Sequence, residues 1–170
     1  MSSVPRSKTF IPEIVEPLPP DLMALTRFAR LMDEAVAVPG TNRRVGLDAA
    51  IGLIPGVGDV VGALLSTWIV IGALRWRVPM WRVARMVANI LIDLAFGSVP
   101  IIGDIFDFLF EENVMNLKML LRYRDRLRPP RSMTEIAGTT IIVILVILGF
   151  ALVILGAMLA VVLWIIHQRR

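Results

Sequence analysis

The sequence predicts an all-α membrane protein, and three observations carry that prediction. Hydrophobic residues make up 56% of the 170 residues and charged residues 19%, against about 45–50% and about 25% in soluble domains. One uncharged run near the C-terminus is long enough to cross a bilayer. Two shorter apolar stretches share an internal motif. We expect an amphipathic N-terminal helix, two helix–break–helix repeats that are re-entrant or interfacial, and one C-terminal transmembrane helix.

The first 20 residues contain five prolines and predict extended backbone. Proline-rich segments favour polyproline II conformation and show no helical period. The segment lacks the apolar core of a signal peptide. We expect a disordered tail or an extended arm over a partner at 1–20. A membrane-associated helical domain that contains the repeats should follow over 21–128, and a transmembrane helix over 132–168.

Residues 21–38 are predicted to form the amphipathic helix. Asp21 is its expected N-cap, and the segment Val38-Pro39-Gly40 is expected to end it. The helix lies either on the membrane surface or against the rest of the chain. Its apolar residues recur at steps of three and four, at Leu22, Leu25, Ala29, Met32 and Val36.

An internal repeat occupies the middle of the chain. Residues 47–65 and 92–110 align at an offset of 45, with seven identities in 19 positions. The shared pattern is D-x3-G-x2-P-x2-G-D. It falls on Asp48, Gly52, Pro55, Gly58 and Asp59 in the first copy, and on Asp93, Gly97, Pro100, Gly103 and Asp104 in the second.

Each copy predicts a helix, a break and a second helix. The first glycine is a natural helix C-cap, and the proline disfavours helix in the residue before it. The second glycine tolerates the turn. The aspartate after it, Asp59 or Asp104, stands at the N-cap of the next apolar run. These ten residues are therefore assigned a structural role, with an ion or proton pathway as the alternative.

The charges around the repeats indicate how they meet the membrane. Arginines stand before, between and after the two copies, whereas a unit that crossed once would lose positive charge on one side. Re-entrant or interfacial units are therefore expected, and the alternative is that residues 60–76 form a second span. We expect the arginines to contact anionic lipid or partner proteins rather than nucleic acid. They are Arg75, Arg77, Arg82, Arg85, Arg122, Arg124, Arg126 and Arg128.

The strongest membrane signal is the uncharged run of 31 residues over 136–166, because about 20 apolar residues cross a bilayer. A polar helix is predicted before it over 111–128, with Val114, Leu117 and Leu121 on one face. Gly149 and Gly156 mark a stripe of small residues where another helix can approach closely. The alternative is that they face lipid alone. More arginine before the span than after it predicts that the bulk of the chain is cytoplasmic.

The double motif, with RMVANILID before its second copy and ENVMNLKMLL after it, resembles an uncharacterised family, domain of unknown function 4112. The resemblance covers about residues 30–122. It implies a membrane-associated protein of a family common in bacteria, hence the bacterial inner membrane, and no chemistry. Besides the motif residues, the matching positions are Met86, Asn89, Asp107, Asn113 and Asn116.

The composition excludes several classes of metal site. With no cysteine and one histidine, thiolate metal sites, iron–sulfur clusters and multi-histidine centres are excluded. We expect no enzyme activity, no metal and no cofactor, with pigment or haem contacted only through a neighbouring subunit. The prediction is a non-catalytic accessory subunit that stabilises a larger membrane complex, for example a photosynthetic or respiratory one. The alternative is an ion or small-solute transport component that uses the repeat aspartates.

Overall fold

The structure, a computed structural model, describes residues 18–37, 44–47, 57–97, 99 and 111–168. These residues form five helices and one short β-hairpin. The elements are α1 (Pro20–Glu34), β1 (Val36–Ala37), β2 (Arg44–Val45), α3 (Val57–Arg75), α4 (Met80–Gly97), α6 (Glu112–Tyr123) and α7 (Met133–Gln168).

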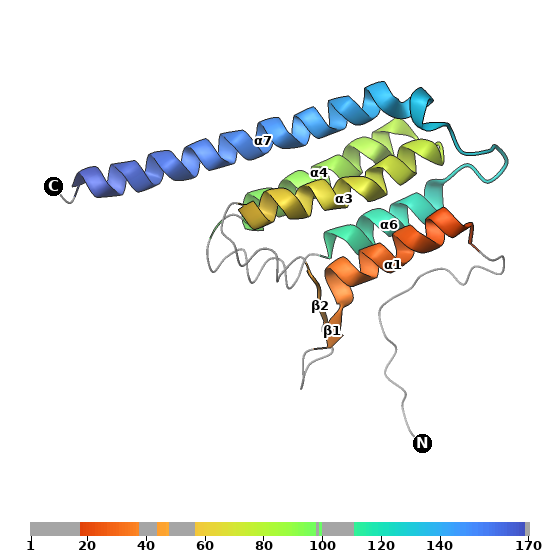
Figure 1. Cartoon of the computed structure of the whole chain (residues 1–170), viewed down its shortest axis with the longest axis horizontal. Helices are drawn as coiled ribbons and strands as arrows, with labels where there is room; N and C mark the ends of the chain where they lie inside the picture. The colour runs from red at the N-terminus through yellow and green to blue at the C-terminus, as the bar shows by residue number, and fades with distance from the viewer. Residues whose placement is uncertain (1–17, 38–43, 48–56, 98, 100–110, 169–170) are drawn as a thin grey trace, which may run out of the picture.

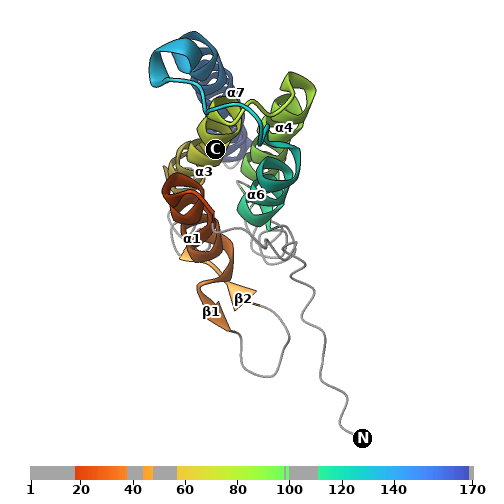
Figure 2. The ribbon, with the colours of Figure 1, turned by 90° about the vertical axis from the view of Figure 1, so that its right-hand side faces the viewer.

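Four of the helices pack as a bundle, and α7 covers one side of it. Helices α3 and α4 are antiparallel neighbours, α1 lies against α3 and α6, and α6 also contacts α4. Helix α7 packs on α3 and α4, on the side opposite α1 and α6 (Figures 1 and 2). All five helices contribute fully or almost fully buried side chains to the core, for example Leu22, Ile69, Met86, Leu120 and Ile147.

Helix α1 packs on the rest of the chain, and its buried apolar residues are Leu22, Leu25, Ala29 and Met32. The expectation that Asp21 is its N-cap is wrong. The helix begins at Pro20, a residue suited to the first helical position, and Asp21 lies in the first turn. There its Oδ2 accepts a hydrogen bond from Nε1 of Trp76 at 2.9 Å, which ties α1 to the end of α3.

The predicted extent of this helix is also wrong at its C-terminus. It ends at Glu34, and Val36 and Ala37 pair with Val45 and Arg44 in an antiparallel hairpin. Gly46 follows the second strand, and a Cβ there would collide with the carbonyl of Met32. A glycine at this position therefore allows the hairpin to lie directly on the last turn of α1.

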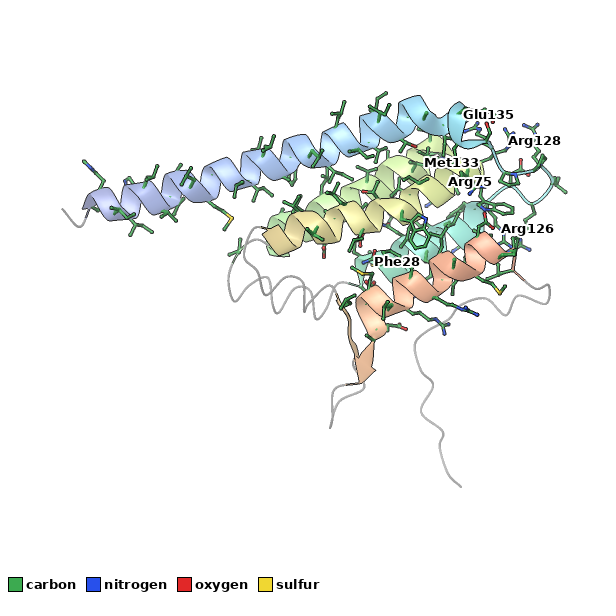
Figure 3. The ribbon with its side chains drawn as sticks, in the orientation of Figure 1. Phe28, Arg75, Arg126, Arg128, Met133 and Glu135 are labelled. Atoms are coloured by element: carbon green, nitrogen blue, oxygen red, sulfur yellow. The ribbon has the colours of Figure 1, made fainter. Side chains whose placement is uncertain are left out.

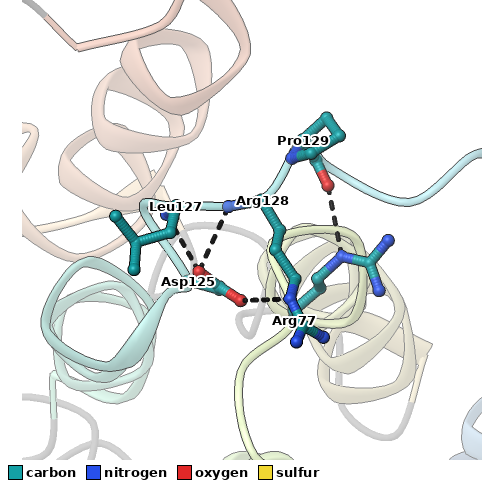
Figure 4. Close-up of polar contacts among 5 residues, drawn as sticks. All are labelled: Arg77, Asp125, Leu127, Arg128 and Pro129. Atoms are coloured by element: carbon teal, nitrogen blue, oxygen red, sulfur yellow. Dashed lines mark hydrogen bonds and ion pairs between the residues drawn. The ribbon is translucent and has the colours of Figure 1, made fainter.

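The turn between α3 and α4 is a Schellman motif. Val78 N–H donates to the carbonyl of Ala73 at 3.0 Å, and Arg77 N–H donates to that of Leu74 at 3.3 Å. Arg77 holds the left-handed position with φ 56°, where glycine is the usual residue. Its Nε donates to the carbonyl of Pro129 at 3.2 Å (Figure 4).

The structure describes only part of the repeats. Gly58 and Asp59 lie in the first turn of α3, so Asp59 is inside the helix and the prediction that it is an N-cap is wrong. Asp93 lies within α4, which ends at Gly97. Outside the described residues lie Asp48, Gly52, Pro55, Pro100, Gly103 and Asp104.

Helix α6 is shorter than the predicted 111–128 because an aspartate turn ends it. The backbone becomes extended at Arg124, where ψ is 145°. The Oδ1 atom of Asp125 then accepts hydrogen bonds from the N–H groups of Leu127 and Arg128 at 2.9 and 3.2 Å (Figure 4). Such local bonds compete with helix.

Helix α7 is the one described helix long and apolar enough to cross a membrane. Its 36 residues span about 54 Å at 1.5 Å per residue. Only 17% of its most apolar stretch is buried inside the protein. The buried residues are Ile136, Val143, Ile147 and Ala151, and the C-terminal part of the helix projects past α3 and α4 (Figure 1).

Candidate functional site: a buried polar network beside a basic groove

Polar side chains from all four bundle helices are buried at the centre of the bundle. A buried polar group destabilises a fold unless it is hydrogen-bonded. Most of these side chains are joined in two connected groups, one around Glu112 and one around Asp33. The buried polar and charged residues are Asp33, Ser66, Thr67, Asn89, Glu112, Asn113 and Asn116.

Glu112 is the centre of the first group. It begins α6 and is only 2% exposed. Its Oε2 accepts a hydrogen bond from Oγ of Ser66 on α3 at 3.1 Å. Its Oε1 accepts one from Nδ2 of Asn116, one turn along α6, at 2.9 Å.

Asn116 carries this group across to α4. Its Nδ2 also donates to the carbonyl oxygen of Met86 at 3.2 Å, and its Oδ1 accepts from Nδ2 of Asn89 at 2.8 Å. The side chain is completely buried and uses both its donor and its acceptor atoms. A chain of hydrogen bonds therefore links α3, α6 and α4 through one asparagine.

The second group joins α1 to the start of α6. Asp33 Oδ2 accepts a hydrogen bond from the backbone N–H of Val114 at 2.7 Å, and its Oδ1 accepts one from Nδ2 of Asn113 at 2.7 Å. The first N–H groups of a helix have no partner within the helix. Glu111, which stands at the N-cap of α6, forms no capping bond with its side chain, so Asp33 supplies the acceptor.

A groove of about 390 Å³ lies between α4 and α6, on the outer side of Asn89. It receives Arg82, Arg85 and Asn89 from α4, which are spaced at i, i+3 and i+7 on one face. Helix α6 contributes a second face with the same spacing. The lining residues from α6 are Met115, Lys118, Met119, Arg122 and Tyr123.

The groove is strongly basic. It has four cationic side chains and no carboxylate among its lining residues. The Arg82 guanidinium lies over the rings of Trp81 and Tyr123, at 3.6 and 4.0 Å from their centroids. Its Nε is buried without a hydrogen-bond acceptor in the described part of the chain.

The predicted contact arginines separate into two places. Arg82, Arg85 and Arg122 meet in the groove. The others lie near the end of α3 and in the segment before α7. Arg75 is 4.0 Å from Asp21, and Arg77 donates a hydrogen bond to the carbonyl of Pro129. Arg124 lies 5.9 Å from the Trp76 ring, Arg128 pairs with Asp125, and Arg126 is exposed. Gly149 and Gly156 lie on α7, away from both places.

Sequence reasoning overlooked Asp33, Ser66, Glu112 and Lys118. Two signals could have found some of them. Glu112, Asn113 and Asn116 continue the apolar stripe of α6 toward its N-terminus, so their spacing matches that of buried residues. Lys118 stands four residues before Arg122, on the same helical face.

The network joins the four bundle helices through hydrogen bonds. Its carboxylates accept hydrogen bonds from amides and a hydroxyl, and no group of three histidine, cysteine or acidic side chains among the residues that the structure describes is placed to hold a metal. What the site offers to a ligand is the basic groove.

These features define a small helical domain with a polar interior, joined to one helix long and apolar enough to cross a membrane. The chain matches the family model described as Domain of unknown function (DUF4112) over residues 21–124, and it belongs to this family. The match includes the bundle helices and both parts of the site, whereas α7 lies beyond it. No curated protein and no solved structure matches the chain.

Proposed function

We propose that this protein is a non-catalytic accessory subunit of the bacterial inner membrane, which associates through α7 with other membrane proteins and stabilises their complex. The observation that carries the proposal is the large uncovered surface of α7. Leu152, Leu159 and Trp164 are more than half exposed. Within the chain, nothing described covers this part of the helix.

Small residues give one face of α7 the shape that close helix packing needs. A Cβ at Gly138, Gly149 or Gly156 would meet no atom within 4 Å. Gly138 and Gly156 are 18 residues apart, which is five turns of about 3.6 residues, so they share a face. Gly149 and Gly156 lie seven apart, on nearly the same face. In membranes, such stripes allow two helix backbones to approach closely.

Basic residues at the start of α7 support a cytoplasmic position for the bundle. Arg75, Arg126 and Arg128 lie at the same end of the molecule as Met133 and Glu135, where α7 begins (Figure 3). The N–H of Arg131 donates to the carbonyl of Arg75 at 2.8 Å, which joins this segment to α3. Lysine and arginine flanking a span favour the cytoplasmic side.

The test is gentle extraction of the native protein in detergent, followed by sizing and mass spectrometry of what migrates with it. Wild type should migrate in one large complex with a defined partner. The double variant Gly149→Leu/Gly156→Leu should no longer migrate with the complex, because leucine side chains prevent the close approach of a partner helix. Ala157→Leu adds bulk about a quarter turn away and should leave the complex intact.

A wild-type protein that migrates alone or only with copies of itself would contradict the proposal. If that homo-oligomer also conducted ions after reconstitution into vesicles, the transport function would replace the accessory role. Equal loss of the complex in the Ala157→Leu control would show that α7 associates without using the glycine face.

A further inference from the structure

We propose that the groove between α4 and α6 binds the phosphate of an anionic phospholipid headgroup. The proposal goes beyond the accessory role, because it concerns the opposite side of α4 from the site where α7 packs and requires no partner subunit. It assigns a ligand class to Arg82, Arg85, Lys118 and Arg122, with Asn89 at the inner wall of the groove.

The first argument is charge. Arg82 and Arg85 stand three residues apart on α4, and Lys118 and Arg122 stand four apart on α6. Like charges at these spacings destabilise a helix, and here two such pairs face the same groove. The structure describes no carboxylate in contact with these four cations. An anion between the two pairs would remove the repulsion.

The second argument is the orientation of Arg82. Its guanidinium face is held over Trp81 and Tyr123, which leaves the edge with its N–H groups for a ligand. The buried Nε has no acceptor within the described part of the chain, although buried polar atoms are nearly always hydrogen-bonded. A planar guanidinium with a free edge is suited to phosphate oxygens.

The third argument concerns the inner wall of the groove. Asn89 is 8% exposed, and its Nδ2 is fixed by the hydrogen bond to Asn116. The buried network therefore holds the side chain at the inner wall of the groove. A single neutral amide among cations gives the wall polarity without adding charge.

The apolar residues that line the groove and the position of the groove in the bundle favour a lipid over free phosphate. Met115 and Met119 give the groove an apolar wall. Such a wall can contact glycerol and acyl carbons of a lipid, whereas an inorganic ion has no apolar group to place against it. Most residues that line the groove belong to the first half of α4 and the second half of α6. These parts of the two helices lie at the end of the bundle where α7 begins (Figure 1). Trp81 and Tyr123 beside it are residues that favour the headgroup level. Its volume of about 390 Å³ is that of a small-ligand pocket.

The experiment measures lipid binding to the full chain in neutral detergent by native mass spectrometry. The probes are phosphatidylglycerol and phosphatidylcholine of equal chain length, with inorganic phosphate as competitor. Both lipids carry the phosphate, but the four groove cations would repel the choline ammonium of phosphatidylcholine. Wild type should therefore bind phosphatidylglycerol at least about tenfold more tightly than phosphatidylcholine. Inorganic phosphate should compete weakly.

Two variants of equal charge separate the groove from general basicity. Arg85→Gln/Lys118→Gln removes two cations from the groove and should abolish the preference. Arg27→Gln/Arg30→Gln removes two exposed cations from α1, away from the groove, and should retain it. Arg82→Lys keeps the charge but loses the planar edge, and should weaken binding by about tenfold.

Three results would overturn the proposal. Equal binding of the two lipids by wild type would exclude selection of an anionic headgroup, and this comparison needs no variant to fold. Equal loss of preference in the α1 control would show a general charge effect. Full competition by inorganic phosphate, with no gain from the lipid, would assign the groove to a free anion.

Discussion

Asp33 near the end of α1 accepts a hydrogen bond from the backbone N–H of Val114 at 2.7 Å, across 81 residues of sequence. One helix thus supplies the N-terminal cap of another. The start of α6 and the end of α1 are therefore held in register, and the polar interior forms between them. Because the bond is buried and its acceptor is a carboxylate, it should contribute more than an average hydrogen bond.

Asp33→Ala should lower the free energy of unfolding by about 2–3 kcal/mol, since Val114 N–H and the Asn113 amide both lose their buried acceptor. The measurement is denaturant unfolding of the full chain, followed by tryptophan fluorescence. Glu111→Ala is the matched control, because Glu111 stands at the local N-cap and forms no side-chain capping bond. It should change stability by less than about 0.5 kcal/mol. Equal effects from the two variants would refute the capping role of Asp33.

Asn116→Leu should destabilise the fold by about 3 kcal/mol, because Glu112, Asn89 and the Met86 carbonyl all lose a buried partner. Leucine is close in volume, so the effect would arise from hydrogen bonds rather than from a cavity. A double-mutant cycle of Asn116→Ala with Asn89→Ala should give a coupling energy of about 1 kcal/mol or more. Additive effects in the cycle would show that the two amides do not act together.

Arg77 should respond to substitution according to its backbone. It occupies the left-handed position of the α3–α4 turn with φ 56°. Arg77→Val should lose about 1–2 kcal/mol, because a β-branched side chain is strained there. Arg77→Gly should unfold at a temperature close to that of wild type, because the strain that glycine relieves offsets the lost hydrogen bond to Pro129. Thermal unfolding by circular dichroism measures both, and a less stable glycine variant would contradict the assignment.

Gly46→Ala should lower stability by about 1–3 kcal/mol, because the added methyl group would force the hairpin away from the backbone of Met32. Gly62→Ala is the control. Gly62 lies inside α3 with open space at its Cβ, so alanine there should raise stability by about 0.5–1 kcal/mol. The two substitutions are chemically identical, and opposite signs in the same unfolding assay would confirm the difference in environment.

Periodicity was sufficient for the parts of the fold in which apolar side chains face the core. Leu22, Leu25, Ala29 and Met32 of α1 are buried at the predicted spacing, as are Val114, Leu117 and Leu121 of α6. Helix α7 follows from length and composition alone. These features depend on local sequence and on the exclusion of apolar groups from water, which a single sequence records directly.

The polar interior could not be predicted in the same way. Pattern analysis treats Asp33 and Glu112 as surface residues because isolated buried charge is unfavourable, and only the tertiary fold shows which groups compensate them. The spacing of Arg82, Arg85 and Asn89 predicts one face of α4. That this face adjoins the one with Lys118 and Arg122 depends on how α4 and α6 pack, and no local pattern contains that information.

The central claim, that the glycine face of α7 contacts another membrane protein, is tested most directly by crosslinking in native membranes. The chain contains no cysteine, so a single cysteine at Gly156 or at Ala157 reacts at one known place. Gly156→Cys should yield one discrete adduct with a different membrane protein, and Ala157→Cys should yield little. Adducts with a second copy of this chain alone, or equal yields at the two positions, would contradict the account.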